Sequence, residues 1–124
     1  MAGLLLVCLG SVIGAPLRYV IDRAIQSRHE RVFPFGTLAV NLTGALALGV
    51  VVGSAARGGL SDLAVDALGT GLIGSYTTFS TFSWETLRMI EEGSFWQASA
   101  NIVVSVGAGL GAAALGFWLA TLGG

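Results

Sequence analysis

The chain has 124 residues, of which 54% are hydrophobic and only 10% are charged. A soluble domain usually carries about 25% charged residues, so lipid must be the solvent for most of this surface. The formal net charge is −1 and lysine is absent, which argues against a nucleic acid partner. Cys8 is the single cysteine, so an internal disulfide is excluded, and we expect it to be a small packing residue.

Four apolar stretches are long enough to cross a bilayer, which takes about 20 residues of helix. The predicted helices cover residues 3–25, 35–56, 63–90 and 95–122. No basic segment precedes the first leucines, so the first stretch is expected to stay in the membrane rather than act as a cleaved signal peptide. The predicted fold class is an all-α integral membrane protein with a single transmembrane domain over 1–124. Because the connectors are short, consecutive helices should be antiparallel neighbours.

The connectors hold most of the charges. The first and third connectors, with the helix ends beside them, carry Arg23, Arg28, Arg31 and Arg88. The opposite side carries only Arg57, so the arginine excess places the termini outside the cytoplasm. The excess is small, and insertion in both orientations stays open. His29 is expected to be solvated, and Ser61 or Asp62 is expected to cap the third helix.

Glycines spaced four apart predict close helix packing. The pairs are Gly10 with Gly14, Gly49 with Gly53, and Gly107 with Gly111. Small residues at this spacing let helix backbones approach in lipid. Four tightly packed helices leave little room for a hydrated path inside one chain, so an oligomer is expected.

Polar residues inside three of the spans are candidate functional residues, because they are costly in a membrane. Arg18 is either an anchor at the interface or part of an electropositive vestibule. Asn41 shares a helix face with Thr37, and it either bonds a neighbouring helix or donates to an anion. Asn101 and Ser105 also share a face, with the same two alternatives.

The third span contains the polar segment 74–85, GSYTTFSTFSWE, after Gly69 and Gly71. This composition predicts a helix broken in mid-membrane, with backbone carbonyls freed near the break. A continuous helix softened by glycine is the alternative. Phe79, Phe82 and Glu85 are spaced by three and share a helical face. The aromatic pair could serve packing, or its positive ring edges could line a path for a small anion.

A catalytic set is not recognisable, since no nucleophile has a base at a familiar spacing. Walker and dinucleotide motifs are also missing. The sequence therefore predicts a transport protein rather than an enzyme.

Three blocks in order resemble the Fluc (CrcB) family of fluoride channels. They are residues 10–19, GSVIGAPLRY, residues 36–42, GTLAVNL, and residues 74–85. The resemblance implies a passive channel that exports fluoride and lowers its toxicity. It also implies an antiparallel, dual-topology dimer with two fluoride pathways, in the plasma membrane of a bacterium or archaeon. The partners would be fluoride, membrane lipid and a second copy, or a paralogue in a heterodimer.

The resemblance also implies roles for individual residues. Asn41 matches the pore amide, Phe79 and Phe82 match the pore phenylalanines, and Arg18 matches the vestibule arginine. Polar positions at or near the pore are Thr37, Ser80, Thr81 and Ser105, and Glu85 is grouped with them. The carbonyls of Gly74 and Thr77, with those of the partner, would hold a structural sodium ion.

The chain departs from the usual family pattern at three places. It has Gly74-Ser75 and Gly10-Ser11 where glycine pairs are frequent, and Asn101 where some members carry an aromatic hydroxyl.

Two alternative functions stay open. A small multidrug or cation exporter is also a four-helix dimer, but it would need a carboxylate within the first helix, and none precedes Asp22. A non-transporting assembly subunit would explain the glycines but not the polar segment 74–85.

Overall fold

The computed structural model describes residues 1–28 and 33–122. His29 and Arg31, for which the sequence predicts a solvated connector, lie outside the described residues. Three long helices are present: α1 (Ala2–Gln26), α2 (Phe35–Ala56) and α6 (Phe95–Thr121). Between α2 and α6 lie four shorter segments, α3 (Asp62–Val65), η1 (Asp66–Ile73), α4 (Gly74–Tyr76) and α5 (Ser80–Glu91).

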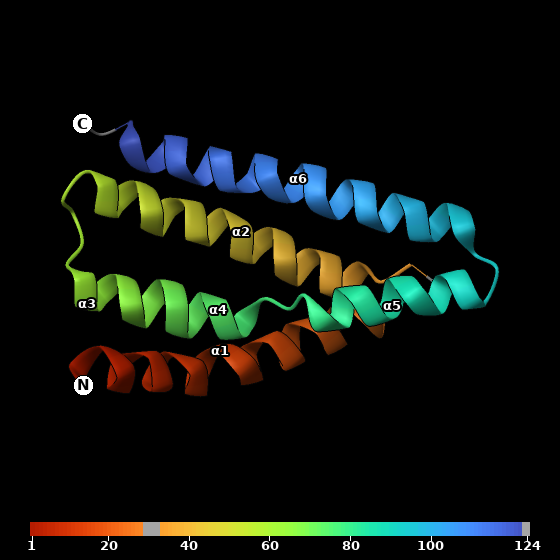
Figure 1. Cartoon of the computed structure of the whole chain (residues 1–124), viewed down its shortest axis with the longest axis horizontal. Helices are drawn as coiled ribbons and strands as arrows, with labels where there is room; N and C mark the ends of the chain where they lie inside the picture. Colours follow the sequence, from red (N-terminus) through yellow and green to blue (C-terminus); the bar gives the residue numbers. More distant parts are fainter. Residues whose placement is uncertain (29–32, 123–124) are drawn as a thin grey trace.

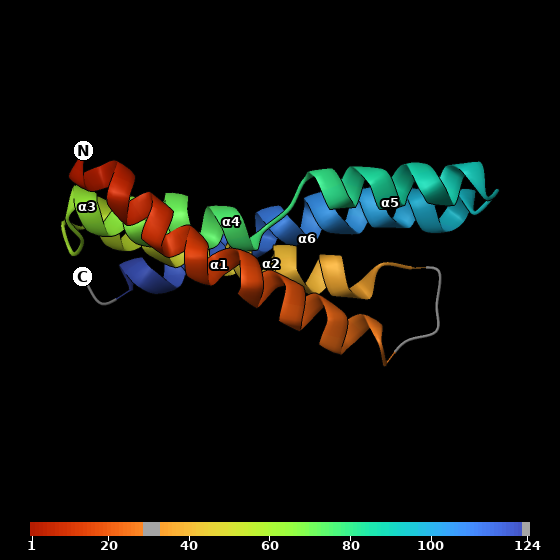
Figure 2. The ribbon, with the colours of Figure 1, turned by 90° about the horizontal axis from the view of Figure 1, so that it is seen from below.

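The helices run antiparallel in a bundle, seen lengthwise in Figure 1. The start of α1, the α2–α3 connection and the end of α6 lie at one end, and the α5–α6 connection lies at the other. α2 packs along α6, and α1 packs against η1 and α4. Figure 2 shows that α5 lies beside the first half of α6, apart from the second half of α1. The described chain is therefore tightly packed at one end and divided into two helix pairs at the other.

Among the described residues, three helices are long and apolar enough to cross a membrane: α1, α2 and α6. The protein is thus a multi-pass, all-helical membrane protein. The region 63–90 does not qualify as one helix because a π-helix and a non-helical link interrupt its α-helical hydrogen bonding. η1 is a π-helix, and residues 77–79 form a non-helical link between α4 and α5. Thr77 is extended, with φ −81° and ψ 160°.

Short caps fix the helix ends. The side chain of Ser61 accepts a hydrogen bond from the Ala64 N–H (3.2 Å), which confirms Ser61 rather than Asp62 as the cap of α3. The Gln26 Oε1 atom accepts from the Gly36 N–H (3.0 Å), so the end of α1 caps the start of α2. Gly93 follows α5 with φ +80°, a left-handed conformation that side chains rarely adopt and that suits the turn into α6.

Glycines account for the closest helix contacts. Gly10 and Gly14 lie against the backbone of η1, and Gly49 lies against the backbone of α6 near Ala113. Two of the predicted glycine pairs therefore serve packing. The packing expectation is wrong within this chain for the third pair, because a side chain at Gly107 or Gly111 would meet no atom within 4 Å. These two glycines lie on a face of α6 that turns away from α2.

Large apolar side chains remain exposed along the outer faces of the bundle. On α1 they include Leu4, Leu5, Leu9, Val12 and Ile13, each more than 60% exposed. Cys8 is exposed on the same helix, so the expectation that it is a packing residue is wrong within this chain. Such faces are stable only against lipid or another protein surface.

Candidate functional site

A cavity of about 390 Å³ lies between α2, η1, α4, α5 and α6. It brings together six of the residues selected from the sequence: Asn41, Gly74, Thr77, Phe79, Phe82 and Ser105. Most of its remaining lining is small or apolar, including Gly44, Ala45 and Gly109. The cavity is therefore a largely apolar space with a few polar groups, a composition that suits the binding of a small, selected ligand.

Asn41 makes hydrogen bonds with both backbone groups of Thr78, in the link between α4 and α5. Its Nδ2 atom donates to the Thr78 carbonyl (2.9 Å), and its Oδ1 atom accepts from the Thr78 N–H (2.8 Å). Asn41 therefore bonds another segment of the chain, close to one of the two sequence alternatives, and its donation to an anion stays a prediction. One N–H of its amide bonds the link, and the second has no partner among the described residues while Asn41 lines the cavity.

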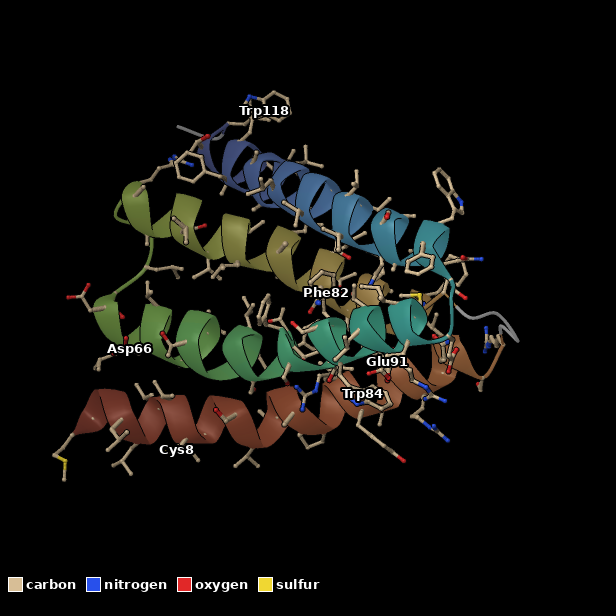
Figure 3. The ribbon with its side chains drawn as sticks, turned by 45° about the vertical axis from the view of Figure 1, so that its right-hand side comes forward. Cys8, Asp66, Phe82, Trp84, Glu91 and Trp118 are labelled. Carbon is tan, nitrogen blue, oxygen red and sulfur yellow. The ribbon has the colours of Figure 1, made fainter. Side chains whose placement is uncertain are left out.

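Phe79 and Phe82 lie together at the start of α5, with ring centroids 5.9 Å apart and tilted by 43°. Figure 3 shows Phe82 extending from α5 toward α2 and α6, with Trp84 on another side of the helix. Phe79 is 79% exposed, so much of its ring is uncovered within one chain. The pair therefore forms an aromatic wall of the cavity that continues to the protein surface.

The geometry separates Glu85 from the two phenylalanines. The Thr37 hydroxyl donates a short hydrogen bond (2.6 Å) to Glu85 Oε1, which links α2 to α5. Thr37 is 3% exposed. Glu85 is not among the described residues that line the large cavity.

A second cavity of about 200 Å³ lies between the second half of α1, the start of α2 and the start of α5. Its charged lining residues are Arg18 and Asp22, and its hydroxyl-bearing ones are Tyr19, Thr37, Thr78 and Thr81. Thr78 lines both cavities, so they lie on either side of the link between α4 and α5. This cavity therefore combines one positive and one negative charge with several hydroxyl groups.

A hydrogen-bond chain connects the large cavity to the body of α5. The Ser105 hydroxyl donates to Asn101 Oδ1 (3.3 Å), and Asn101 Nδ2 donates to the Thr86 hydroxyl (2.8 Å). Thr86 in turn donates to the Phe82 carbonyl (2.8 Å). Asn101 is 1% exposed and bonds Thr86 on α5, as the interhelical alternative predicts, and a track of donors along this face stays a prediction.

The four carbonyls of residues 74–77, at the break, have no hydrogen-bond partner among the described residues, and they include the two selected from the sequence, those of Gly74 and Thr77. Both residues line the large cavity, and Gly74 is exposed. Ser80 is exposed near the same link, with its hydroxyl 3.4 Å from that of Thr78, and it lines neither cavity.

Sequence reasoning missed Thr78 and Thr86 as site residues. Thr78 lines both cavities and makes hydrogen bonds with Asn41, and Thr86 accepts a hydrogen bond from Asn101. Thr78 lies between the selected residues Thr77 and Phe79, but nothing in its spacing distinguishes it. Thr86 follows Glu85 and reads as an ordinary helix residue until its partner on α6 is known.

The chain is similar to a known family over most of its length. Residues 5–117 match the family model described as CrcB-like protein, Camphor Resistance. The protein named fluoride-specific ion channel FluC 1 of Streptomyces avermitilis is 55% identical over 116 residues, 94% of each chain. FluC 1 of Frankia casuarinae is 52% identical over 121 residues, also 94% of each. FluC of Alteromonas mediterranea is 44% identical over 122 residues, 95% of this chain and 93% of the relative.

Proposed function

The chain belongs to the CrcB-like family, and from that premise we propose that it is a passive, fluoride-selective channel and not an enzyme. The observation that carries the proposal is the large cavity, where an amide, a hydroxyl and two aromatic rings meet beside the helix break. The relatives carry the name of fluoride-specific channels, so a small cation exporter and a non-transporting subunit are not favoured.

The groups in the cavity suit the chemistry of fluoride. Fluoride is small, strongly hydrated and accepts hydrogen bonds, so a dehydrating path must offer donors in place of water. The second N–H of Asn41 is such a donor. The Ser105 hydroxyl would become one by turning its proton from Asn101 Oδ1 toward the ion. The edges of Phe79 and Phe82 add positive potential without a full charge that would trap the ion. Chloride is larger, and we expect the path to exclude it where the ion must lose its water.

The smaller cavity would be the anion vestibule. Its Arg18 supplies a positive charge, and Thr37 and Thr81 supply hydroxyls on the way to Thr78. Thr78 lines both cavities, which supports a route from the vestibule to the aromatic wall. Glu85 would act through Thr37, the donor to its carboxylate, and Ser80 would act at the mouth of the route.

The same observations support a proposal for the membrane arrangement. We infer four spans, with α3, η1, α4 and α5 together forming the third and the link 77–79 as its break in mid-membrane. The exposed ring of Phe79 supports a second copy placed over the large cavity. An antiparallel, dual-topology dimer in the plasma membrane of a bacterial or archaeal cell would provide it. A paralogue could take the place of that second copy.

A structural sodium ion fits the free carbonyls at the break. Carbonyl oxygens are suitable ligands for sodium, and unwound helices in membranes supply them. The carbonyls of Gly74 and Thr77 accept no hydrogen bond in the described chain. Water is scarce inside a membrane, so a bound ion would supply the partner that these carbonyls lack. Two carbonyls are too few for a coordination shell, and the same pair from a second copy would complete it. The ion would neutralise the carbonyl dipoles where two copies meet.

Fluoride efflux from proteoliposomes tests the proposed function. A fluoride electrode should record rapid efflux, and chloride efflux should stay at the level of protein-free vesicles. Phe82→Ile should slow fluoride efflux at least about tenfold, about 1.4 kcal/mol of barrier. Phe95→Ile is the matched control, because Phe95 is exposed at the start of α6 and lies outside both cavities. Equal fluoride and chloride efflux, or no efflux from folded protein, would contradict the proposal.

A further inference from the structure

The break between α4 and α5 can be explained hydrogen bond by hydrogen bond. In a continuous α-helix each N–H bonds the carbonyl four residues earlier. The Thr78 N–H would then bond the Gly74 carbonyl, and the Thr81 N–H would bond the Thr77 carbonyl. In this structure both N–H groups bond side-chain oxygens instead. Thr78 N–H donates to Asn41 Oδ1 (2.8 Å), and Thr81 N–H donates to Thr78 Oγ1 (3.2 Å).

We propose that Asn41 and Thr78 are positioning residues that keep the carbonyls of Gly74 and Thr77 available to a cation. Each side chain takes the N–H that would otherwise occupy one of these carbonyls. The inference rests on the sodium site of the proposed function. It adds the reason why the chain leaves these two oxygens free, and it assigns Thr78 a role that the sequence did not indicate.

Asn41 makes hydrogen bonds with both the N–H and the carbonyl of Thr78. Besides accepting from the N–H, its amide donates to the Thr78 carbonyl (2.9 Å). Such a paired contact replaces both helical bonds of Thr78 at once, so it stabilises the break without leaving that residue unsatisfied. Because Asn41 also lines the cavity with the two carbonyls, one side chain serves both the anion path and the cation site.

Thr78 acts through its hydroxyl. The Oγ1 atom accepts from the Thr81 N–H and donates to Thr81 Oγ1 (3.1 Å), so it caps the first turn of α5. The side chain is 9% exposed, and water is therefore a poor substitute for it. Valine has the same shape but no hydroxyl, whereas serine keeps the hydroxyl. These two substitutions separate the cap from the volume of the side chain.

A sodium titration of the purified chain tests the inference. Thermal unfolding is measured in detergent as sodium replaces a large organic cation at constant ionic strength. A sodium ion bound to the folded state raises the unfolding temperature of the native chain. The sodium concentration for half of this rise should increase at least about tenfold in Thr78→Val and in Asn41→Leu. It should stay within about twofold of the native value in Thr78→Ser.

Thr43→Val is the matched control. The Thr43 hydroxyl lies 2.8 Å from that of Tyr76, close to the break, but it binds neither of the two N–H groups. The control should lose some stability and keep the native sodium requirement. If Thr78→Val also unfolds at lower temperature with an unchanged sodium requirement, Thr78 only caps α5 and the inference fails.

A second pair of variants covers the case in which Thr78→Val unfolds at every sodium concentration. Asn41→Asp keeps an oxygen that accepts from the Thr78 N–H, so it should keep the sodium response that Asn41→Leu loses. Equal loss in both would overturn the inference. No sodium response in the native chain would overturn it together with the sodium site. The fluoride efflux assay tests the channel function separately from both.

Discussion

The two halves of the bundle are held together by different interactions. The packed half consists of residues 2–14, 46–76 and 106–121, where glycines bring α1 onto η1 and α2 onto α6. The polar half consists of residues 15–26, 35–45 and 77–105, where side-chain hydrogen bonds join the helices. Both cavities draw on the polar half, and the smaller one lies entirely within it.

This difference indicates how a small membrane protein can be both stable and permeable. Close backbone packing leaves no space for an ion. It needs no polar side chains, so it stabilises the helices without placing polar groups in lipid. A polar path needs donors, and the polar groups beside it need partners inside the protein where water is scarce. The pairs Thr37–Glu85, Asn41–Thr78 and Asn101–Thr86 provide such partners. We therefore expect changes in the packed half to affect folding, and changes in the polar half to affect flux.

The largest effect in this comparison is expected from Gly49→Ala. The added methyl group would lie against the Ala113 carbonyl and within 2.9 Å of the Phe117 amide nitrogen. Overpacking of this kind costs about 1–3 kcal/mol. Thermal unfolding in detergent should show the loss, and Gly111→Ala should not, because its methyl group meets open space. Equal unfolding temperatures for the two variants would contradict the role assigned to the packed half.

A smaller effect is expected from the Asn101–Thr86 bond. Hydrogen bonds between membrane helices contribute about 0.6 kcal/mol on average. A double-mutant cycle with Asn101→Leu and Thr86→Val should give a coupling free energy of this size in unfolding measurements. Both variants should also slow fluoride efflux, because Thr86 holds the Phe82 carbonyl and Asn101 holds Ser105. A coupling of zero would mean that the two residues are independent.

The smallest effect is expected from Arg88→Ala at the end of α5. Arg88 pairs with Glu92 (3.1 Å) and lies 5.3 Å from the centre of the Trp84 ring. Its side chain is 60% exposed, so the pair contributes less than about 1 kcal/mol. Unfolding temperature and fluoride efflux should both stay near the native values. A large loss of fluoride efflux would contradict this prediction and would mean that Arg88 contributes to the ion path.

The sequence by itself determined the membrane class and the main helical regions. Few charges and long apolar stretches are sums over neighbouring residues, so they do not depend on which helices meet. The segment 74–85 also indicated irregular backbone, because its small and β-branched residues disfavour a lipid-facing helix whatever surrounds it. The candidate residues Asn41, Phe79, Phe82 and Ser105 came from local motifs, and the structure gathers them around one cavity.

Only the tertiary structure decided which polar groups are partners. It assigned Glu85 to Thr37, Asn101 to Thr86 and Asn41 to Thr78. It also showed that Gly49 packs whereas Gly107 and Gly111, with the same spacing pattern, do not. A helical period gives the face on which a residue lies, but not the helix that the face meets. That choice depends on helix rotation and crossing, which the whole bundle sets at once, and the hydrogen bonds at the break follow from it.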